Sequence, residues 1–308
     1  MTDVLRVLEA GLLTTIQDVG RPQAVASGVP PGGAMDRFAH SAANLIVGND
    51  RTAATLECTM RGPRLVVEQP CVVAVTGGDF DPRVNGEAAP MWTGVTLAPG
   101  DELALGRRRN GARAYIAVAG GIVADRWLGS MSTSLMTGRG GMHGRALVEG
   151  DVIAAGAPVD APARSLAADL QPRYEDHTLY VIDGPHIAML SEESRAAVFD
   201  SAFTVSHDSN RMGYRLDGPA LETRGDEVLS FGLVAGSLQV PSGGRPILLM
   251  ADHQTAGGYP VVANVISASM SVAAQLAPGD ELRFAETSID AALAMRAAQR
   301  AALEFLTT

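Results

Sequence analysis

The chain has 308 residues, of which 46% are hydrophobic and 19% are charged, and its formal net charge is −10. This length fits two domains better than one. The negative charge disfavours nucleic acid as a partner, and no stretch reaches the roughly 18 unbroken apolar residues of a membrane span. The N-terminus has no signal pattern, and two cysteines indicate no disulfide framework, so we expect a cytoplasmic protein.

The basic residues are all arginine, because the chain has no lysine. A Schiff-base lysine for pyridoxal phosphate is therefore excluded, as is a phosphate-binding loop of the GxxxxGK[ST] type. Biotin cannot be attached covalently to this chain, because its attachment needs a lysine amine. Any ATP, biotin or carboxylated carrier would rely on another site or another chain.

Short apolar runs bounded by Gly, Pro or Asp predict buried strands along most of the sequence. Clear examples lie at 64–67, 72–75, 114–118 and 246–250. Glycine is abundant and aromatic residues make up only 5% of the chain. The sequence therefore predicts a mainly β protein.

Helical patterns are rarer, and three stand out. The first follows Asp36, a good N-cap, and ends at Gly48, with its apolar positions spaced along one helix face. The second spans about 191–201 and has acidic residues near its start, where the helix dipole favours them. The third is the Ala-rich segment 289–306, which Thr287 or Ser288 can cap.

A Pro-Gly-Asp turn that enters an apolar strand occurs twice, at 97–103 and at 276–282. A related Gly-Asp turn lies at 149–153. Such turns are common in β-barrels. Their recurrence indicates two similarly built β-domains rather than one large sheet.

The segment that separates these domains is rich in Ala, Pro, Asp and Ser and has no clear periodicity, which is typical of a linker. We expect an N-terminal domain over 1–155, a linker over 156–172 and a C-terminal domain over 173–308 that carries the terminal helix.

Four groups of motifs are more specific than composition. They are TTIQDVGR at 14–21 with GVPPGGAMD at 28–36; AVAGGI at 117–122 with LGSMST at 128–133; SNRMGYRL at 209–216; and QVP at 239–241 with PILLMADHQTAGGYP at 246–260. This set resembles the biotin-dependent carboxyltransferase family that includes the C-type subunit of the ATP-dependent 5-oxoprolinases, also known as allophanate hydrolase subunit 2 or the KipA group. It is also similar to one half of the carboxyltransferase region of urea carboxylase.

The resemblance covers nearly the whole chain, and it implies two cyclophilin-like β-barrel domains with a few short helices and a C-terminal helix. It implies membership of an ATP-dependent complex that hydrolyses 5-oxo-L-proline to L-glutamate, in which this chain need not be active alone. The implied partners are a small B-type subunit, homologous to KipI or allophanate hydrolase subunit 1, and a larger A-type subunit, with ATP bound by or with these partners.

Two other functions stay open. The chain could be a carboxyltransferase component of a urea- or allophanate-processing complex that acts on biotin held elsewhere. It could instead be a non-enzymatic regulator that binds a homologue of a sensor-kinase inhibitor.

Four residues are candidates for catalysis of lactam opening, in which ATP can phosphorylate the amide oxygen before water attacks. Arg211 can clamp an oxyanion bidentately, or tie a loop to the barrel. Asp252 can hold a substrate N–H or act as a base, or cap the following Gly-rich turn. Gln254 lies at the same strand end, where sites are often built. Tyr259 can donate to a carbonyl, or be a half-buried core aromatic.

Four residues are candidates for substrate binding. Gln239 can recognise an amide, since its side chain offers both a donor and an acceptor, or it is an ordinary strand residue. Asn210 lies in the SNRMGYRL motif, and Gln17 lies in a compact polar cluster at 17–21. Asp36 is favoured as a helix cap over an acid. The six histidines show no metal-ligand spacing, so we expect no metal site.

Overall fold

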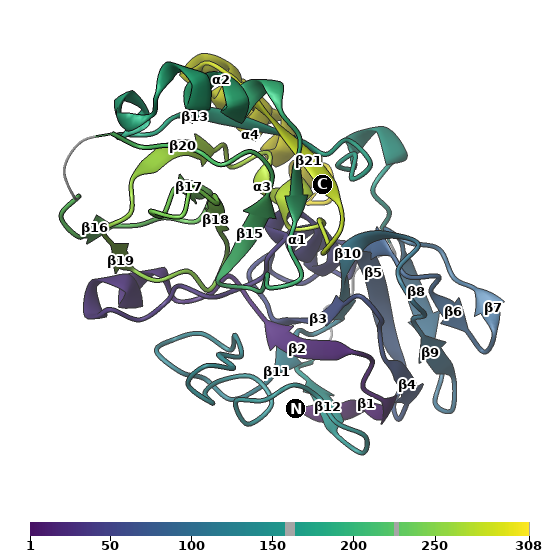
Figure 1. Ribbon diagram of the computed structural model, residues 1–308. Coiled ribbons are helices and arrows are strands. Elements are labelled where there is room, and N and C mark those ends of the chain that lie inside the picture. Colours follow the sequence, from purple (N-terminus) through teal and green to yellow (C-terminus); the bar gives the residue numbers. More distant parts are fainter. Residues whose placement is uncertain (158–163, 225–227, 308) are drawn as a thin grey trace. The chain divides into compact units, whose positions relative to one another are not determined.

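The computed structural model describes residues 1–157, 164–224 and 228–307 and is mostly β, as the sequence predicts (Figure 1). The chain forms two compact units, each discontinuous in sequence. Unit 1 comprises Met1–Arg21, Gly32–Tyr174 and Gln299–Thr308, and unit 2 comprises Pro22–Pro31 and Glu175–Ala298.

Unit 1 contains two antiparallel sheets. Its strands are β1 (Thr2–Glu9), β2 (Leu13–Gln17), β3 (Thr55–Thr59), β4 (Arg64–Val67), β5 (Cys71–Asp79), β6 (Arg83–Val84), β7 (Glu87–Ala88), β8 (Gly94–Leu97), β9 (Glu102–Ala104), β10 (Asn110–Val118), β11 (Ile122–Val123) and β12 (Val152–Ala155). One sheet has the order β11-β12-β1-β4-β9-β6-β7, and the other has the order β2-β3-β10-β5-β8.

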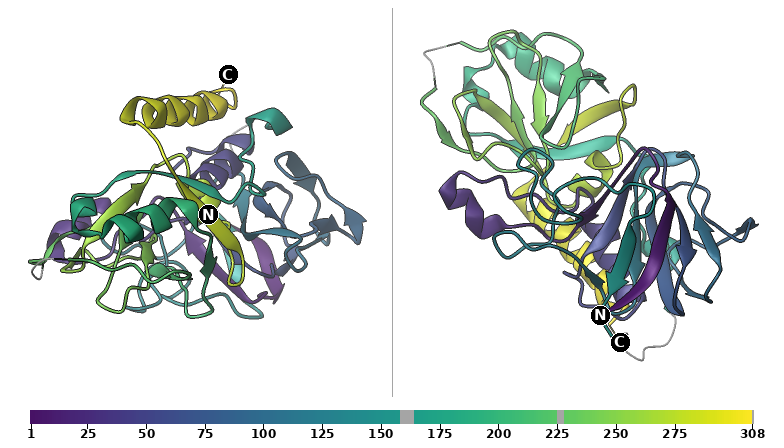
Figure 2. Two further views of the ribbon diagram at one scale, coloured as in Figure 1. Left: turned by 45° about the horizontal axis from the view of Figure 1, so that its top comes forward. Right: turned by 90° about the horizontal axis from the view of Figure 1, so that it is seen from below.

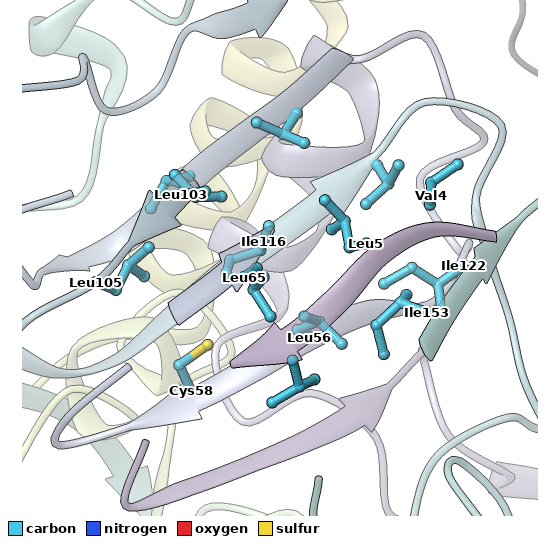
Figure 3. Packing of buried hydrophobic residues seen from close by; sticks show 14 of the residues in the cluster. Val4, Leu5, Leu56, Cys58, Leu65, Leu103, Leu105, Ile116, Ile122 and Ile153 are labelled. Atoms are coloured by element: carbon cyan, nitrogen blue, oxygen red, sulfur yellow. The ribbon is translucent and has the colours of Figure 1, made fainter. Parts of the chain in front are cut away.

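The core of unit 1 is an apolar cluster to which both sheets contribute (Figure 3). Leu5 and Leu65 come from the first sheet, and Leu56 and Ile116 come from the second. Full burial of one such side chain stabilises the fold by about 1.5–3 kcal/mol. The alternation of buried and partly buried residues along β4 is the pattern expected for a sheet with one face on this core.

The second sheet of unit 1 is buried on both faces, because α1 (Arg37–Ile46) packs on its other side. This explains why β10 is buried at nearly every residue rather than at every second one. Ala39 and Ala43 of the helix are in the same cluster as Ala117 of β10, and these small side chains permit a close approach. The sheet therefore holds the N-terminus of α1 in a fixed place.

Unit 2 is built on a closed barrel with strand order β13-β20-β17-β18-β15-β14-β21 (Figures 1 and 2). Its strands are β13 (Thr178–Asp183), β14 (Phe203–Val205), β15 (Gly213–Asp217), β17 (Ser237–Gln239), β18 (Ile247–Leu249), β20 (Val261–Val265) and β21 (Glu281–Glu286). A separate ribbon pairs β16 (Phe231–Gly232) with β19 (Ala256–Gly257).

The three predicted helices are confirmed by α1, α2 (Glu192–Asp200) and α4 (Ile289–Glu304), the last seen side-on in the left view of Figure 2. The predicted caps of α1 and α4 form, since the side chains of Asp36 and Ser288 accept from backbone N–H groups of the first turn. Ser191 caps α2 in the same way, which the sequence did not predict. The sequence did not predict the short helices α3 (Met270–Ala273), η1 (Pro22–Ser27), η2 (Ala168–Leu170) and η3 (Ile187–Met189). Single turns of this kind carry too little periodicity to be recognised.

The three Gly-Asp turns noted in the sequence have the same geometry. In each, the aspartate Oδ2 accepts from a backbone N–H three residues earlier: Asp101 from Ala98 at 2.7 Å, Asp151 from Val148 at 2.8 Å and Asp280 from Ala277 at 2.8 Å. The preceding glycine has a φ of 87–91°, a region that favours glycine. Each turn also exchanges two backbone hydrogen bonds with a valine of a neighbouring strand: Val67, Val7 and Val205.

The compact units differ from the predicted domain limits in three places. The segment Pro22–Pro31, predicted for the N-terminal domain, belongs to unit 2. Within the predicted linker 156–172, Leu166 is buried in the cluster of unit 1 that contains α1, while residues 158–163 lie outside the described part of the chain. The C-terminal segment, predicted for the second domain, contributes Ala302 of α4 and Leu306, which follows the helix, to the same cluster. The Ala-rich composition of this segment therefore did not indicate that its last residues pack into the core of unit 1.

Candidate functional site

The candidate residues fall into two groups. Gln17 and Asp36 belong to unit 1. The other six belong to unit 2: Asn210, Arg211, Gln239, Asp252, Gln254 and Tyr259. Each group is described within its own unit.

Arg211 and Asp252 lie together although 41 positions separate them. β15 and β18 pair antiparallel, with Gly213 opposite Leu249. The segment before β15, which contains Arg211, therefore lies beside the segment after β18, which contains Asp252. Arg211 donates from Nε to Oδ2 of Asp252 at 2.8 Å and from Nη2 to Oδ1 at 3.2 Å, and the arginine side chain is 9% exposed. The guanidinium fork is thus directed at Asp252, which is the loop-tying role considered above.

Gln239 and Gln254 also meet, at the end of β17. Gln254 Nε2 donates to Gln239 Oε1 at 3.4 Å. Gln239 is 1% exposed, and its Nε2 has no hydrogen-bond partner among the described residues. A buried unpaired amide group costs about 1–3 kcal/mol of stability.

The surroundings of this amide pair are apolar. In the sheet register Gln239 lies opposite Ile247 on one side and Val261 on the other, so the three side chains share a face. Val261 forms a small cluster with Leu233 and Leu249, against which Ile247 and Phe231 pack. A few polar groups in an apolar setting are typical of small-molecule sites.

The remaining unit 2 candidates are more exposed. Asn210 Oδ1 accepts from the backbone N–H of Met212 at 2.8 Å, which shapes the turn before β15. Tyr259 is 47% exposed, so it is not a core aromatic residue. His253 is buried, and this burial lowers the pKa of its imidazole, which keeps the ring neutral.

Asp36 of unit 1 is engaged in structural contacts. Its Oδ1 caps α1, and its Oδ2 accepts from the Tyr174 hydroxyl at 2.6 Å. The backbone N–H of Asp36 donates to the Tyr115 hydroxyl, which in turn donates to Glu57 Oε2, each at 2.8 Å. Burial raises the pKa of Tyr115 well above its usual value. The sequence analysis did not select Glu57 and Tyr115 as site candidates, because nothing in a strand's sequence shows which polar side chains meet across neighbouring strands.

Gln17 lies beside a second network, centred on Asp18. Asp18 accepts from the hydroxyls of Ser130 and Ser132, each at 2.6 Å, and from two backbone N–H groups. Gln17 Nε2 donates to Thr15 Oγ1 at 3.1 Å and to Thr133 O at 3.2 Å. These contacts fasten the LGSMST motif to the end of β2, so the predicted polar cluster supports the fold.

Arg21 and His40 complete the buried polar groups of this region. The Arg21 guanidinium donates to Ser132 O, and its carbon lies 4.8 Å from the centroid of the Trp127 ring. His40 is fully buried, with Nδ1 2.9 Å from Thr55 Oγ1. Burial lowers the pKa of His40 to about 4, although the charges of Asp18 and Glu57 oppose the shift.

The glycine-rich segment 137–145 does not fit a phosphate. The backbone N–H groups of Gly138 and Arg139 donate to Ser134 O, and that of Gly141 donates to Asp125 O, so donors that would hold a phosphate are already used. Within the described ranges, no three His, Cys, Asp or Glu side chains gather as metal ligands. The helices of those ranges include none with the length and apolar character needed to cross a membrane.

Comparisons with known proteins cover nearly the full chain. A family model described as "Carboxyltransferase domain, subdomain A and B" matches residues 27–286. The sequence is 38% identical to the C-type subunit of 5-oxoprolinase from Escherichia coli, over 98% of this chain and 97% of the relative. It is 32% identical to the corresponding 5-oxoprolinase protein of Haemophilus influenzae, over 95% of this chain and 94% of the relative.

Among solved structures, the urea amidolyase of Kluyveromyces lactis is similar, with a TM-score of 0.93 and 30% identity. The match covers 99% of this chain but only 20% of that chain. The counterpart of this protein is therefore one part of a much longer polypeptide there.

Proposed function

The chain belongs to the carboxyltransferase-domain family of subdomains A and B, and we propose that it is a component of an ATP-dependent complex that hydrolyses 5-oxo-L-proline to L-glutamate. The observation that carries the proposal is the match to the C-type subunit of 5-oxoprolinase, which runs along 98% of this chain and 97% of that protein. A subunit with a letter in its name implies further subunits, so the proposal includes a small B-type subunit and an A-type subunit as partners.

The chemistry of the proposed reaction explains why partners are needed. A lactam resists water at neutral pH, and phosphorylation of its oxygen by ATP makes the carbonyl carbon reactive. This chain has no lysine for a phosphate-binding loop, and the glycine-rich segment 137–145 has committed its donors. We therefore assign ATP binding to the partners, and to this chain the positioning of the substrate. No covalent biotin enters the reaction through this chain.

The polar groups of unit 2 are the ones we assign to the substrate. Gln239 and Gln254 hold amide groups in an apolar cluster, and the Arg211–Asp252 pair fixes the loops that precede β15 and follow β18. In this role Arg211 and Asp252 are positioning residues. Asn210 and Tyr259 lie at the exposed ends of the same segments.

Reconstitution tests the proposal. Glutamate release from 5-oxoproline is measured with ATP and purified partner subunits, with and without this chain. We expect release only from the full mixture. Equal release without this chain would overturn the proposal.

Variants separate an enzymatic role from a purely regulatory one. Arg211→Met should lower kcat/KM by about tenfold or more, because the freed Asp252 carboxylate no longer holds the loop. Arg245→Met is the matched control, since Arg245 forms an exposed ion pair with Asp217 in the same unit and such pairs are worth little. Unchanged activity of Arg211→Met in a complex shown intact by size-exclusion chromatography would favour a binding role.

A carboxyltransferase of the urea-processing type is the second candidate, and the TM-score of 0.93 to K. lactis urea amidolyase favours it. It predicts urea-dependent ATP turnover when a biotin carboxylase and a biotin carrier are supplied. Turnover with 5-oxoproline but not with urea would exclude it.

A further inference from the structure

We propose that a cavity on the outer face of the unit 2 barrel, beside β21, binds a small free α-amino acid in its zwitterionic form. The cavity has a volume of about 190 Å³ and is lined by His177, Thr178, Ala202, Glu281, Leu282 and Arg283. The candidate residues described above are not among these six, so the inference goes beyond the proposed function and does not depend on it.

β21 forms the floor of the cavity. Leu282 of this strand is 1% exposed and points into the barrel, so Glu281 and Arg283 on either side of it point outward. β14 pairs with one edge of β21 and β13 pairs with the other. Ala202 and His177, each the residue just before one of these strands, therefore stand on opposite sides of the two outward side chains.

The two outward side chains carry opposite charges that have no ionic partner. Within the described residues, neither the Glu281 carboxylate nor the Arg283 guanidinium forms an ion pair, with each other or with a third group. Arg283 Nη1 donates to Asp200 O at 3.4 Å, a long contact that leaves most of the five N–H donors free. Residues two apart on a strand are separated by about 6.6–6.8 Å, so one small molecule with an anionic end and a cationic end can reach both.

His177 supplies a further acceptor to the same cavity. Its Nδ1 lies 2.8 Å from the backbone oxygen of Glu281. A carbonyl oxygen can only accept, so Nδ1 carries the proton and Nε2 of the neutral ring is left as an acceptor. Among the described residues none bonds to this Nε2. The imidazole and the Glu281 carboxylate together offer two acceptors to an ammonium group.

The ligand class follows from these partners. Arg283 can bind a carboxylate through two parallel N–H···O bonds, while Glu281 and His177 accept from the α-ammonium group. The volume is below the roughly 300–1,000 Å³ of sites for drug-sized ligands, so the ligand is small. A carboxylate alone or an amine alone would leave one of the two charges of the cavity without a partner.

A divalent cation fits the cavity less well than a zwitterion does. Arg283 would repel it, and the described part of the chain gathers no third His, Cys, Asp or Glu side chain there as a ligand. The guanidinium therefore selects for a ligand that brings its own negative charge.

NMR of the full chain tests the site directly. The imidazole signals of His177 are assigned by their loss in His177→Gln, and glycine and L-alanine are then titrated at constant pH and ionic strength. We expect saturable shifts of these signals with both amino acids. N-acetylglycine, which has no ammonium group, and glycinamide, which has no carboxylate, should each bind at least about tenfold more weakly.

Charge-removing variants make the test specific. Arg283→Met and Glu281→Gln should each weaken glycine binding by about tenfold or more, because each removes the partner of one charged group of the ligand. Arg245→Met is the control for the arginine, since Arg245 forms an exposed ion pair with Asp217 in the same unit. Glu192→Gln, at the exposed start of α2, is the control for the glutamate. Both controls should bind glycine as the wild type does.

Thermal unfolding shows that each variant is folded. Should Arg283→Met fail to fold, Glu281→Gln still decides, because the exposed carboxylate has no ionic partner in the fold to lose. Three results would each overturn the inference: unmoved His177 signals, equal binding of N-acetylglycine or glycinamide, and wild-type affinity for glycine in Glu281→Gln.

Discussion

Unit 1 buries two carboxylates within hydrogen-bond networks, and both units also bury polar atoms without a partner. In unit 1, Asp18 accepts four hydrogen bonds, and Asp36 accepts from two backbone N–H groups and a tyrosine. Gln17 Oε1 and His40 Nε2 of unit 1, and Gln239 Nε2 of unit 2, are buried with no partner in the described ranges. The paired carboxylates stabilise the fold, whereas each unpaired atom lowers its stability.

The hydrogen bonds of unit 1 also show what two of the family motifs do. The TTIQDVGR and LGSMST motifs lie far apart in sequence, yet their polar residues Asp18, Ser130 and Ser132 bond to one another. These motifs therefore define the architecture of unit 1. The motif that contains Gln254 and Gly257 contributes to unit 2, where Gly257 pairs with Phe231 and Gln254 donates to Gln239.

The largest expected effect comes from breaking the Asp18 network. Asp18→Ala would leave two serine hydroxyls and two backbone N–H groups buried without their acceptor, and should lower the free energy of unfolding by about 3–5 kcal/mol. Urea denaturation measures this change. Asp50→Ala is the control, because Asp50 bonds only within an exposed turn, and it should cost less than about 1 kcal/mol. Equal losses for both variants would contradict the assigned role.

A smaller effect is expected from the pH dependence of His40. Its pKa is about 4 in the fold against 6.5 for the ordinary value, so the unfolded chain binds the proton more readily. Stability is therefore full above pH 6.5 and falls as the pH drops towards 4, by about 2–3 kcal/mol between pH 7 and pH 4.5. His40→Gln does not titrate, so its unfolding free energy should fall by that much less over the same interval. Parallel pH profiles of the two proteins would show that His40 is not the group responsible.

The smallest expected effect is a change in the free energy of unfolding whose sign differs between two glutamine variants. Gln239→Met removes an unpaired amide and should leave the free energy of unfolding unchanged or raise it by up to about 1 kcal/mol. Gln17→Met removes donors to Thr15 and Thr133, and should lower it by about 1 kcal/mol. Thermal or urea unfolding of the two variants decides. A clear loss on changing Gln239 would mean that its amide is satisfied in solution.

The local features of the fold could be predicted from the sequence. Asp36 and Ser288 cap helices as predicted, because a cap depends on only a few neighbouring residues. The apolar run at 64–67 gives β4 at the predicted residues, since a short apolar run next to Gly and Pro predicts a strand. The recurring Gly-Asp turns likewise carry their own geometry.

The pairings of the site could be predicted only in part. Arg211 and Asp252 were both candidates, but their ion pair depends on the register of β15 against β18, which the sequence does not specify. Gln239 and Gln254 were candidates for their chemistry, whereas their hydrogen bond depends on how β17 lies against the segment after β18, which the sequence does not specify. Leu166 was hidden in a Pro-rich stretch whose composition is typical of a linker, although its side chain is buried in unit 1.

The valine contacts of the three Gly-Asp turns make each turn an interchangeable connector. The connector requires only a glycine, an aspartate and one backbone valine alongside, so the residues around it can diverge without disturbing it. Two copies of the turn lie in unit 1 and one lies in unit 2. The same backbone geometry is therefore used in both units, although the residues that surround it differ. The same three positions are natural points at which chimeras of related chains could be joined.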